Sequence, residues 1–159
     1  MLNINYVIGD ATQPIGDGAK IIVHVCNDIG GWGRGFVLAL TKKWPESEQR
    51  YRAWFRGEVK QPFALGEVQF VQVSNDIWVA NLIGQRNVRS VNDVPPVRYD
   101  AIRIGLQRVA SEALQLRASV HLPRIGCGLA GGNWEEVGKI VEENLINRGI
   151  AVTVYDLAL

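Results

Sequence analysis

The chain has 159 residues, of which 47% are hydrophobic and 21% are charged, as is typical of one globular domain with a buried core. Its formal net charge of +1 gives no support for binding a polyanion through bulk electrostatics, and no apolar run is long enough to span a bilayer. The N-terminus lacks the pattern of a signal peptide and the two cysteines are far apart, so we expect a single domain, residues 1–159, located in the cytoplasm.

Hydrophobic periodicity divides the chain into strands that mostly alternate with helices. Alternating apolar residues indicate a half-exposed strand, a continuous apolar run indicates a strand buried on both faces, and apolar residues three or four apart indicate a helix. This order predicts an α/β domain whose mixed sheet carries helices on both faces. The predicted strands cover 2–8, 21–26, 67–73, 78–83, a stretch beginning at 119, and 150–155, and the predicted helices cover 36–44, 46–56, 99–116 and about 133 to 148.

Two of the predicted strands run into glycine-rich loops that open helices. In the later unit, the loop is followed by Asn133, a good N-cap, with Glu136 three residues on as in a variant of the capping box. Glycine leaves backbone N–H groups unshielded, and a helix N-terminus attracts anions, so we predict that this loop holds a phosphate or diphosphate. The alternative is a tight turn without a ligand. The earlier unit has the same form, with the glycine loop at 27–35.

Ligands of such sheets bind beyond the carboxyl ends of the strands. As interpreted from the sequence, Asn27 and Asp28 either cap a turn or contact sugar hydroxyls and position a water. Trp32 either closes over a sugar ring or packs on the neighbouring helix, and the long polar loop at 84–96 is either functional or mobile. The residues predicted at this rim are Asp10, Asn27, Asp28, Gln85, Arg86, the segment 124–132, Asp156 and Leu157.

Other residues have a structural interpretation that competes with a chemical one. His24 and His121 lie within apolar strands, where we expect satisfied core histidines rather than catalytic ones. Tyr51, Trp54 and Phe55 share one face of a helix, which predicts an aromatic stripe directed at the core.

A second group of patterns suggests chemistry more directly. The segment 126–131 fits G-x-G-x-x-G literally, so a dinucleotide-binding Rossmann unit is an alternative. Cys127 stands at a predicted helix N-terminus but lacks an evident base, and a role for its backbone N–H is more plausible than nucleophilic attack. No cluster has metal-ligand spacing, so we expect no metal.

Three motifs together resemble those of the macrodomain family. They are Gly9-Asp10-Ala11, Asn27 with its glycine loop, and Pro123-Arg-Ile-Gly-Cys-Gly-Leu129 followed by Trp134-Glu135. The resemblance extends from about Tyr6 to Leu157. It is strongest to the branch that contains the terminal ADP-ribose protein glycohydrolase and bacterial proteins described as ADP-ribose 1″-phosphate phosphatases. It implies a three-layer α/β/α fold with a mixed central sheet and an ADP-ribose cleft at the rim.

The resemblance also implies roles for individual residues. Asp10 would accept a hydrogen bond from the adenine amino group beside Ala11, and Leu157 would close the adenine pocket. Asn27 would face the distal ribose, and the loop from Gly126 to Ala130 would wrap the diphosphate. The expected ligand-binding residues are Asp10, Ala11, Asn27, Gly33, Gly35, Arg124, Ile125, Gly126, Cys127, Gly128, Leu129, Ala130 and Leu157.

The chain departs from the glycohydrolase at two catalytic positions. A lysine is replaced within Ile83-Gly84-Gln85-Arg86, where arginine stays protonated and cannot act as a nucleophile, and an aspartate is replaced by Ala130. A lysine–sugar adduct is therefore excluded. We expect an ADP-ribose-binding domain, in which hydrolysis of a phosphate or ester at C1″ of the distal ribose, of the phosphatase or de-ADP-ribosylation type, would use a water held between a ligand phosphate and Asn27, Asp28 or Gln85. A non-catalytic ADP-ribose reader is the alternative. The expected partner is ADP-ribose or a derivative, free or attached to protein or nucleic acid, with no cofactor and no membrane.

Overall fold

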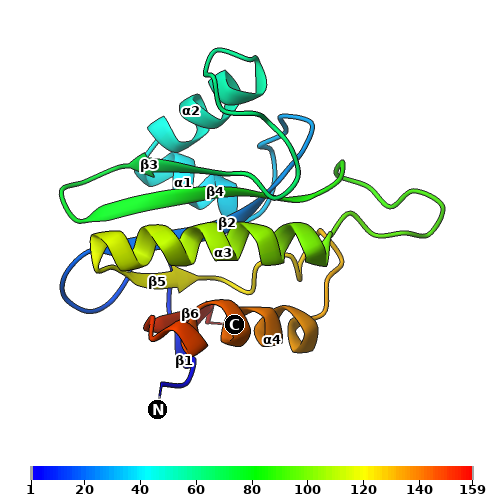
Figure 1. The fold of residues 1–159 in the computed structure, drawn as a ribbon. Coiled ribbons are helices and arrows are strands. Elements are labelled where there is room, and N and C mark those ends of the chain that lie inside the picture. The colour runs from blue at the N-terminus through cyan, green and yellow to red at the C-terminus, as the bar shows by residue number, and fades with distance from the viewer. Residues whose placement is uncertain (1, 159) are drawn as a thin grey trace.

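The computed structural model describes residues 2–158, which form a six-stranded sheet between two pairs of helices (Figure 1). The predicted domain limits, Met1 and Leu159, lie outside these residues. The sheet order is β1-β6-β5-β2-β4-β3, and all neighbours are parallel except β3 and β4. The elements are β1 (Asn5–Ile8), β2 (Lys20–Asn27), α1 (Phe36–Lys43), α2 (Glu46–Phe55), β3 (Val68–Gln72), β4 (Ile77–Gln85), α3 (Tyr99–Leu116), β5 (Ser119–Leu122), α4 (Trp134–Asn144), the 3₁₀ turn η1 (Ile146–Arg148) and β6 (Val152–Asp156).

The alternation of side chains along the central strand β2 explains the three layers. Ile21 and Val23 point into a core formed with α3 and α4, whereas Ile22 and Cys26 point into a core formed with α1 and α2. Because successive strand residues face opposite sides, a strand covered on both faces must be apolar throughout. The predicted α/β/α arrangement with a mixed sheet is confirmed, and Figure 1 shows one helix pair on each face.

The first strand is shorter and more exposed than its apolar alternation indicates. β1 begins at Asn5 rather than at Leu2, and Ile8 at its end is 78% exposed. β1 lies at the edge of the sheet and pairs with β6 alone. Alternation therefore identified the strand correctly, but edge position left Tyr6 and Ile8 largely exposed.

Two helix predictions also need correction. In the aromatic stripe of α2, Tyr51 and Trp54 are fully buried, but Phe55 is 46% exposed because it lies at the last turn of the helix. The predicted helix ending at 148 is divided into α4 and η1, since the backbone tightens after Asn144. Gly149 ends η1 in the left-handed conformation, with φ of 80°, as expected of a helix stop.

Two isolated antiparallel bridges, Gln85 with Val97 and Val91 with Val94, give the segment after β4 the form of a hairpin. Its two sides are joined by a hydrogen bond from the Arg86 N–H to the Pro96 carbonyl oxygen, at 2.8 Å. Its tip turns at Asn92 and Asp93, which both have positive φ, as the type I′ turn of a hairpin requires. In Figure 1 this green segment projects from the body of the protein beyond the end of β4. Among the described residues, no helix is long and apolar enough to cross a membrane.

Candidate functional site

The two glycine loops border a cleft at the carboxyl ends of the parallel strands. Two adjoining cavities lie in it, with volumes of about 340 Å³ and about 200 Å³. The larger, the Asn27 cavity, is lined by Asn27, Trp32 and Gly33, and the smaller, the Gly128 cavity, by Gly126 and Gly128. Both cavities are also lined by Val25, Arg34, Val37, Gln85 and Leu129. The cleft has the size and the partly apolar lining expected of a small-molecule site.

The side chain of Asn27 shapes the first glycine loop. Its Oδ1 accepts hydrogen bonds from the N–H groups of Ile29 and Gly31, at 3.0 and 2.9 Å, and its Nδ2 donates to the Gly31 carbonyl oxygen at 2.9 Å. The Tyr51 hydroxyl donates to the Asn27 backbone carbonyl oxygen at 2.7 Å. The turn-capping role of Asn27 is therefore realised. Within residues 2–158 one hydrogen of its Nδ2 has no acceptor, and it remains for a ligand.

The N-terminus of α1 opens into the cleft. Gly35 is its N-cap, with φ of 79°, and no side chain caps the first turn or brings an acidic group to it. The N–H groups of Phe36 and Val37 have no acceptor among the described residues, and both residues line the Gly128 cavity. Uncapped N–H groups and the positive end of the helix dipole favour an anion at this point.

The N-terminus of α4 is closed to a ligand by the protein itself. The Asn133 side chain accepts a hydrogen bond from the Glu135 N–H at 2.8 Å, which confirms the predicted N-cap. The Asn133 N–H donates to the Tyr99 hydroxyl at 3.1 Å, so Tyr99 takes the place that the capping-box pattern assigned to Glu136. Two glutamates in the first turn add negative charge. An anion near the second glycine loop must therefore rely on the loop and not on this helix.

Most glycines of the second loop are needed by the loop itself. The Gly132 N–H donates to the Gly126 carbonyl oxygen at 2.7 Å, and a Cβ at Gly132 would lie only 2.3 Å from that oxygen. Gly126 and Gly131 have positive φ, of 71° and 78°. A Cβ at Gly128, by contrast, would meet no atom within 4 Å. The number of glycines is thus explained largely by turn geometry, and Gly128 is the position that leaves the cleft open.

The second loop still presents N–H groups to the cleft. Among the described residues, those of Gly128, Leu129 and Ala130 donate no hydrogen bond, and all three residues line the Gly128 cavity. Leu129 is 66% exposed and reaches toward the first loop, since its Cδ1 would lie 4.0 Å from a Cβ at Gly35. The unpaired N–H groups of the two loops therefore border one continuous space.

The residues predicted to hold adenine lie outside both cavities. Asp10 Oδ1 accepts hydrogen bonds from the N–H and the hydroxyl of Thr12, each at 2.8 Å, and its Oδ2 has no donor within residues 2–158. Ala11 is buried beside it, and Leu157 is 76% exposed at the end of β6. One carboxylate oxygen and an uncovered apolar side chain are thus present where the resemblance places adenine.

Arg124 connects the second loop to this side of the cleft. Its Nε and Nη2 donate to the two carboxylate oxygens of Asp156, at 2.7 and 3.0 Å. This arginine lowers the pKa of the Asp156 carboxyl. The guanidinium also lies 5.4 Å from the ring centre of Tyr6 and 5.3 Å from that of Trp134. The ion pair and the two rings hold the start of the loop against the end of β6.

The predicted catalytic residues are not all brought together. Asn27 and Gln85 line the same cavity. Gln85 Nε2 donates to the Asn87 carbonyl oxygen at 3.0 Å, and its Oε1 has no donor within residues 2–158. Asp28 lines neither cavity; its Oδ1 accepts a hydrogen bond from the Asn87 N–H at 2.7 Å. Asp28 thus joins the first loop to the segment after β4.

The predicted ligand-binding residues divide in the same way. Asn27 and Gly33 line the Asn27 cavity, and Leu129 lines both cavities. Six further members of the set line the Gly128 cavity: Gly35, Arg124, Ile125, Gly126, Gly128 and Ala130. Cys127 lines neither. Burial raises the pKa of its thiol, and Sγ donates to the Ile125 carbonyl oxygen at 3.3 Å, and both favour the neutral thiol over the thiolate.

His24 is the one histidine among the described residues that line the two cavities. His24 Nε2 is 2.5 Å from Asn81 Oδ1, and burial lowers the pKa of His24 to about 4, so the ring is neutral and donates this hydrogen bond. Trp32 packs beneath the first loop, where its Nε1 donates to the Thr41 hydroxyl at 2.6 Å. Trp32 therefore packs against α1, and the histidine is a satisfied core residue.

Sequence reasoning missed Arg34, which lines both cavities. Its side chain has no ion pair and no hydrogen-bond acceptor within residues 2–158. A signal was present, because Arg34 is the one charged residue among 29–35. Val88, from the segment after β4, was also missed and lines the Asn27 cavity.

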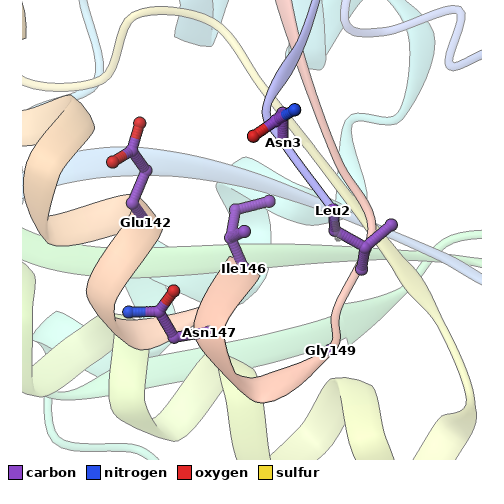
Figure 2. Close-up of a pocket in the computed structure, with 6 residues that line it drawn as sticks. All are labelled: Leu2, Asn3, Glu142, Ile146, Asn147 and Gly149. Carbon is purple, nitrogen blue, oxygen red and sulfur yellow. The ribbon is translucent and has the colours of Figure 1, made fainter.

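A separate hollow of about 470 Å³ lies at the opposite, amino end of β1 and β6 (Figure 2). It contains none of the predicted site residues, and Glu142 is its one ionisable side chain. Its lining consists of Leu2, Asn3, Glu142, Ile146, Asn147 and Gly149. This composition gives no cluster of groups for chemistry, and the cleft between the glycine loops remains the candidate site.

The G-x-G-x-x-G segment does not belong to a Rossmann unit. A dinucleotide-binding Rossmann sheet is parallel with the order 3-2-1-4-5-6. The order found here is β1-β6-β5-β2-β4-β3, with β3 antiparallel. The glycine pattern arises instead from the turn geometry of the second loop.

Comparisons with known proteins give close structural relatives, although no model of a protein family matches the chain. A macrodomain protein from Streptomyces coelicolor is 55% identical, with a TM-score of 0.87, over 97% of this chain and 99% of that one. A protein of unknown function from Bacteroides thetaiotaomicron is also 55% identical, with a TM-score of 0.95, over 98% of this chain and 99% of that one.

Curated relatives are more distant. Chromodomain-helicase-DNA-binding protein 1-like from Danio rerio is 34% identical over 96% of this chain, which spans only 15% of that protein's length. ADP-ribose 1″-phosphate phosphatase from Candida albicans is 25% identical over 88% of this chain and 92% of its own length. DNA ADP-ribosyl glycohydrolase from Thermus aquaticus is 28% identical over 86% of this chain and 37% of its own length.

Proposed function

The chain belongs to the macrodomain family, and we propose that it binds ADP-ribose in the cleft between its two glycine loops. The observation that carries the proposal is the set of unpaired N–H groups on both sides of the cleft, from Gly128 to Ala130 and from Phe36 and Val37. No Asp or Glu is among the residues that line the two cavities. An anion enclosed by N–H donors and a helix N-terminus, without opposing carboxylates, is strongly favoured, and a diphosphate fits this requirement.

The rest of the ligand follows from this placement. We propose that adenine binds at Asp10 and Ala11 under Leu157, where a carboxylate oxygen is free to accept from the amino group. The distal ribose then occupies the Asn27 cavity beside Gly33. The remaining Nδ2 hydrogen of Asn27 can donate to a ribose hydroxyl while the rest of the amide holds the loop.

We propose further that the protein hydrolyses a phosphate or acyl ester at C1″. Two observations support this step: Gln85 has an unoccupied Oε1 in the Asn27 cavity, and the Candida albicans relative carries the name ADP-ribose 1″-phosphate phosphatase. For the phosphate, a water held by Gln85 attacks phosphorus, the bond from phosphorus to the ribose oxygen breaks, and that oxygen takes the proton that the water loses, which leaves a ribose hydroxyl and inorganic phosphate. With no carboxylate in either cavity, the rate depends on positioning and on stabilisation of charge by N–H groups.

A non-catalytic reader is the second candidate. It is favoured by the neutral His24 and by the amide of Asn27, whose Oδ1 is fully engaged in the loop. Calorimetric titration with ADP-ribose tests binding, and release of phosphate from ADP-ribose 1″-phosphate tests hydrolysis. Turnover that Gln85→Ala abolishes, with Arg86→Ala as a neighbouring control, supports the enzyme. Binding without turnover supports the reader, and no affinity in a folded protein would refute both.

Three broader assignments accompany this proposal. The two free cysteines support a reducing, cytoplasmic location, since disulfides form in oxidising compartments. The nearly complete match to the Streptomyces coelicolor protein supports residues 1–159 as one macrodomain. The ADP-ribose that is bound is either free or attached to protein or nucleic acid. DNA ADP-ribosyl glycohydrolase from Thermus aquaticus supports the last of these targets.

A further inference from the structure

We propose that Arg34 selects ADP-ribose derivatives that carry a phosphate on C1″ over unsubstituted ADP-ribose. This inference rests on the proposed ADP-ribose site, and it assigns to that site a substrate class and a specificity-determining residue. Arg34 lies between Gly33 and Gly35 on the first glycine loop and lines both cavities of the cleft. It therefore stands at the junction of the proposed diphosphate and distal ribose positions.

The guanidinium of Arg34 is available for a ligand. Within residues 2–158 it forms no ion pair and no hydrogen bond. Arg124, another arginine that lines the cleft, is in a different situation, because its Nε and Nη2 already donate to the carboxylate of Asp156, which balances its charge. A second anion in the cleft would thus meet one uncommitted cation, that of Arg34.

The distribution of donors indicates where this second anion binds. The backbone N–H groups of Gly128 to Ala130 and of Phe36 and Val37 surround the Gly128 cavity, and they are sufficient to hold a diphosphate. Of the described residues that line the Asn27 cavity, Arg34 alone has a charged side chain. A ribose is neutral and gives no reason for an arginine there. A phosphate on the ribose would explain the arginine, because a guanidinium can donate two parallel hydrogen bonds to two phosphate oxygens.

The test compares two ligands that differ only in the C1″ phosphate. Dissociation constants for ADP-ribose and ADP-ribose 1″-phosphate are measured by calorimetry in a Gln85→Ala background, so that turnover does not consume the second ligand. Arg34→Gln is expected to weaken binding of the 1″-phosphate about 10- to 100-fold, the usual contribution of a charge-assisted pair, and that of ADP-ribose less than about 3-fold. Arg34→Lys keeps the positive charge but cannot donate two parallel hydrogen bonds. Its affinity for ADP-ribose 1″-phosphate should lie between that of the Gln85→Ala parent and that of Arg34→Gln.

Arg86→Gln is the matched control, because Arg86 is exposed near the same rim and lines neither cavity. It should leave both affinities within about 2-fold, as expected of a screened surface charge. An equal loss for both ligands in Arg34→Gln would place Arg34 on the diphosphate and overturn the inference, as would unchanged affinities for both. Failure of the proposed function has a different signature, namely no ADP-ribose affinity in the folded protein before any substitution at Arg34.

Discussion

The two strand–glycine loop–helix units look alike in sequence but present their backbone differently. In the first unit the loop is shaped by Asn27, and α1 begins without a capping side chain or an acidic residue. In the second unit the loop closes on itself through Gly132, while α4 is capped by Asn133 and begins with two glutamates. The first unit therefore offers a helix terminus to the cleft, and the second offers only loop N–H groups.

This difference shows that a glycine count and a helix start do not by themselves make an anion site. What matters is which N–H groups remain unpaired after the loop has satisfied its own turns. On that criterion the α4 terminus is excluded, whereas Gly128 and the α1 terminus qualify. Both qualify from opposite sides of one cleft, which is the arrangement that a diphosphate between two larger groups requires.

The largest expected effect is loss of ligand binding in Gly128→Val. The side chain would enter open space in the cleft, so it should exclude phosphate without disturbing the fold. We expect ADP-ribose affinity to fall more than about 100-fold, the loss of two charge-assisted hydrogen bonds. Calorimetry measures the affinity, and a thermal midpoint close to that of the parent protein confirms folding. Unchanged affinity would remove the second loop from the site.

Gly132→Ala, in the same loop, should lower the stability of the fold, whereas Gly128→Val should leave the fold intact and block the ligand. Its Cβ would lie 2.3 Å from the Gly126 carbonyl oxygen, so the turn must open. We expect the free energy of unfolding to fall by about 2–3 kcal/mol, in the range measured for overpacked interiors. Urea unfolding at equilibrium measures this quantity. A stability equal to that of the parent would show that the loop does not need glycine at this position.

A substitution outside both loops tests the adenine assignment. Asp10→Ala should weaken ADP-ribose binding about 10-fold, because one hydrogen bond to a carboxylate is lost. Thr12→Val is the control, since it removes the hydroxyl bonded to Asp10 and leaves the carboxylate in place. Affinities of both variants are compared by calorimetry. If the Asp10 variant binds as the parent does, adenine lies elsewhere and the loops alone define the site.

A smaller effect should separate the two helix termini directly. Leu38 is exposed in the first turn of α1, and Leu38→Glu would give this terminus an acidic group like those of α4. We expect ADP-ribose affinity to fall about 2- to 5-fold, with Leu38→Gln as the uncharged control. Glu136→Gln in α4 should change it less than about 2-fold. Equal effects at both helices would contradict the distinction between them.

The smallest expected effect is that of pH on binding. Burial lowers the pKa of both His24 and His121 from 6.5 to about 4, so both stay neutral in the folded protein above pH 6. ADP-ribose affinity should therefore show no inflection between pH 8 and about 6. The unfolded chain takes up these protons first, so the stability conferred by the neutral rings is complete above pH 6.5 and declines as pH falls toward 4. An inflection in affinity near pH 6.5 would implicate a charged histidine.

The order of the strands and helices and the positions of the two glycine loops could be predicted from local sequence patterns. Continuous apolar residues in β2 required cover on both faces, and glycines with polar residues at strand ends located the two loops. The macrodomain resemblance, drawn from Asp10, Asn27 and the segment 123–129, agrees with the relatives found. Local chemistry was sufficient here because turn, strand and helix preferences act over a few residues.

Which polar groups are left without a hydrogen-bond partner depends on contacts that form only in the folded chain. Asp28 and Asn27 look equivalent in sequence, yet Asp28 contacts the Asn87 N–H and Asn27 lines the cavity. Gly128 and Gly132 are likewise indistinguishable in the sequence. In the structure, the carbonyl oxygen of Gly126 leaves no room for a Cβ at Gly132, whereas a Cβ at Gly128 would meet no atom. Hydrogen-bond partners and close approaches are set by segments distant in the chain or by the path of a loop. The position of Arg34 as the one charged residue among 29–35 could draw notice to it, but only the folded chain shows that its guanidinium has no partner among the described residues.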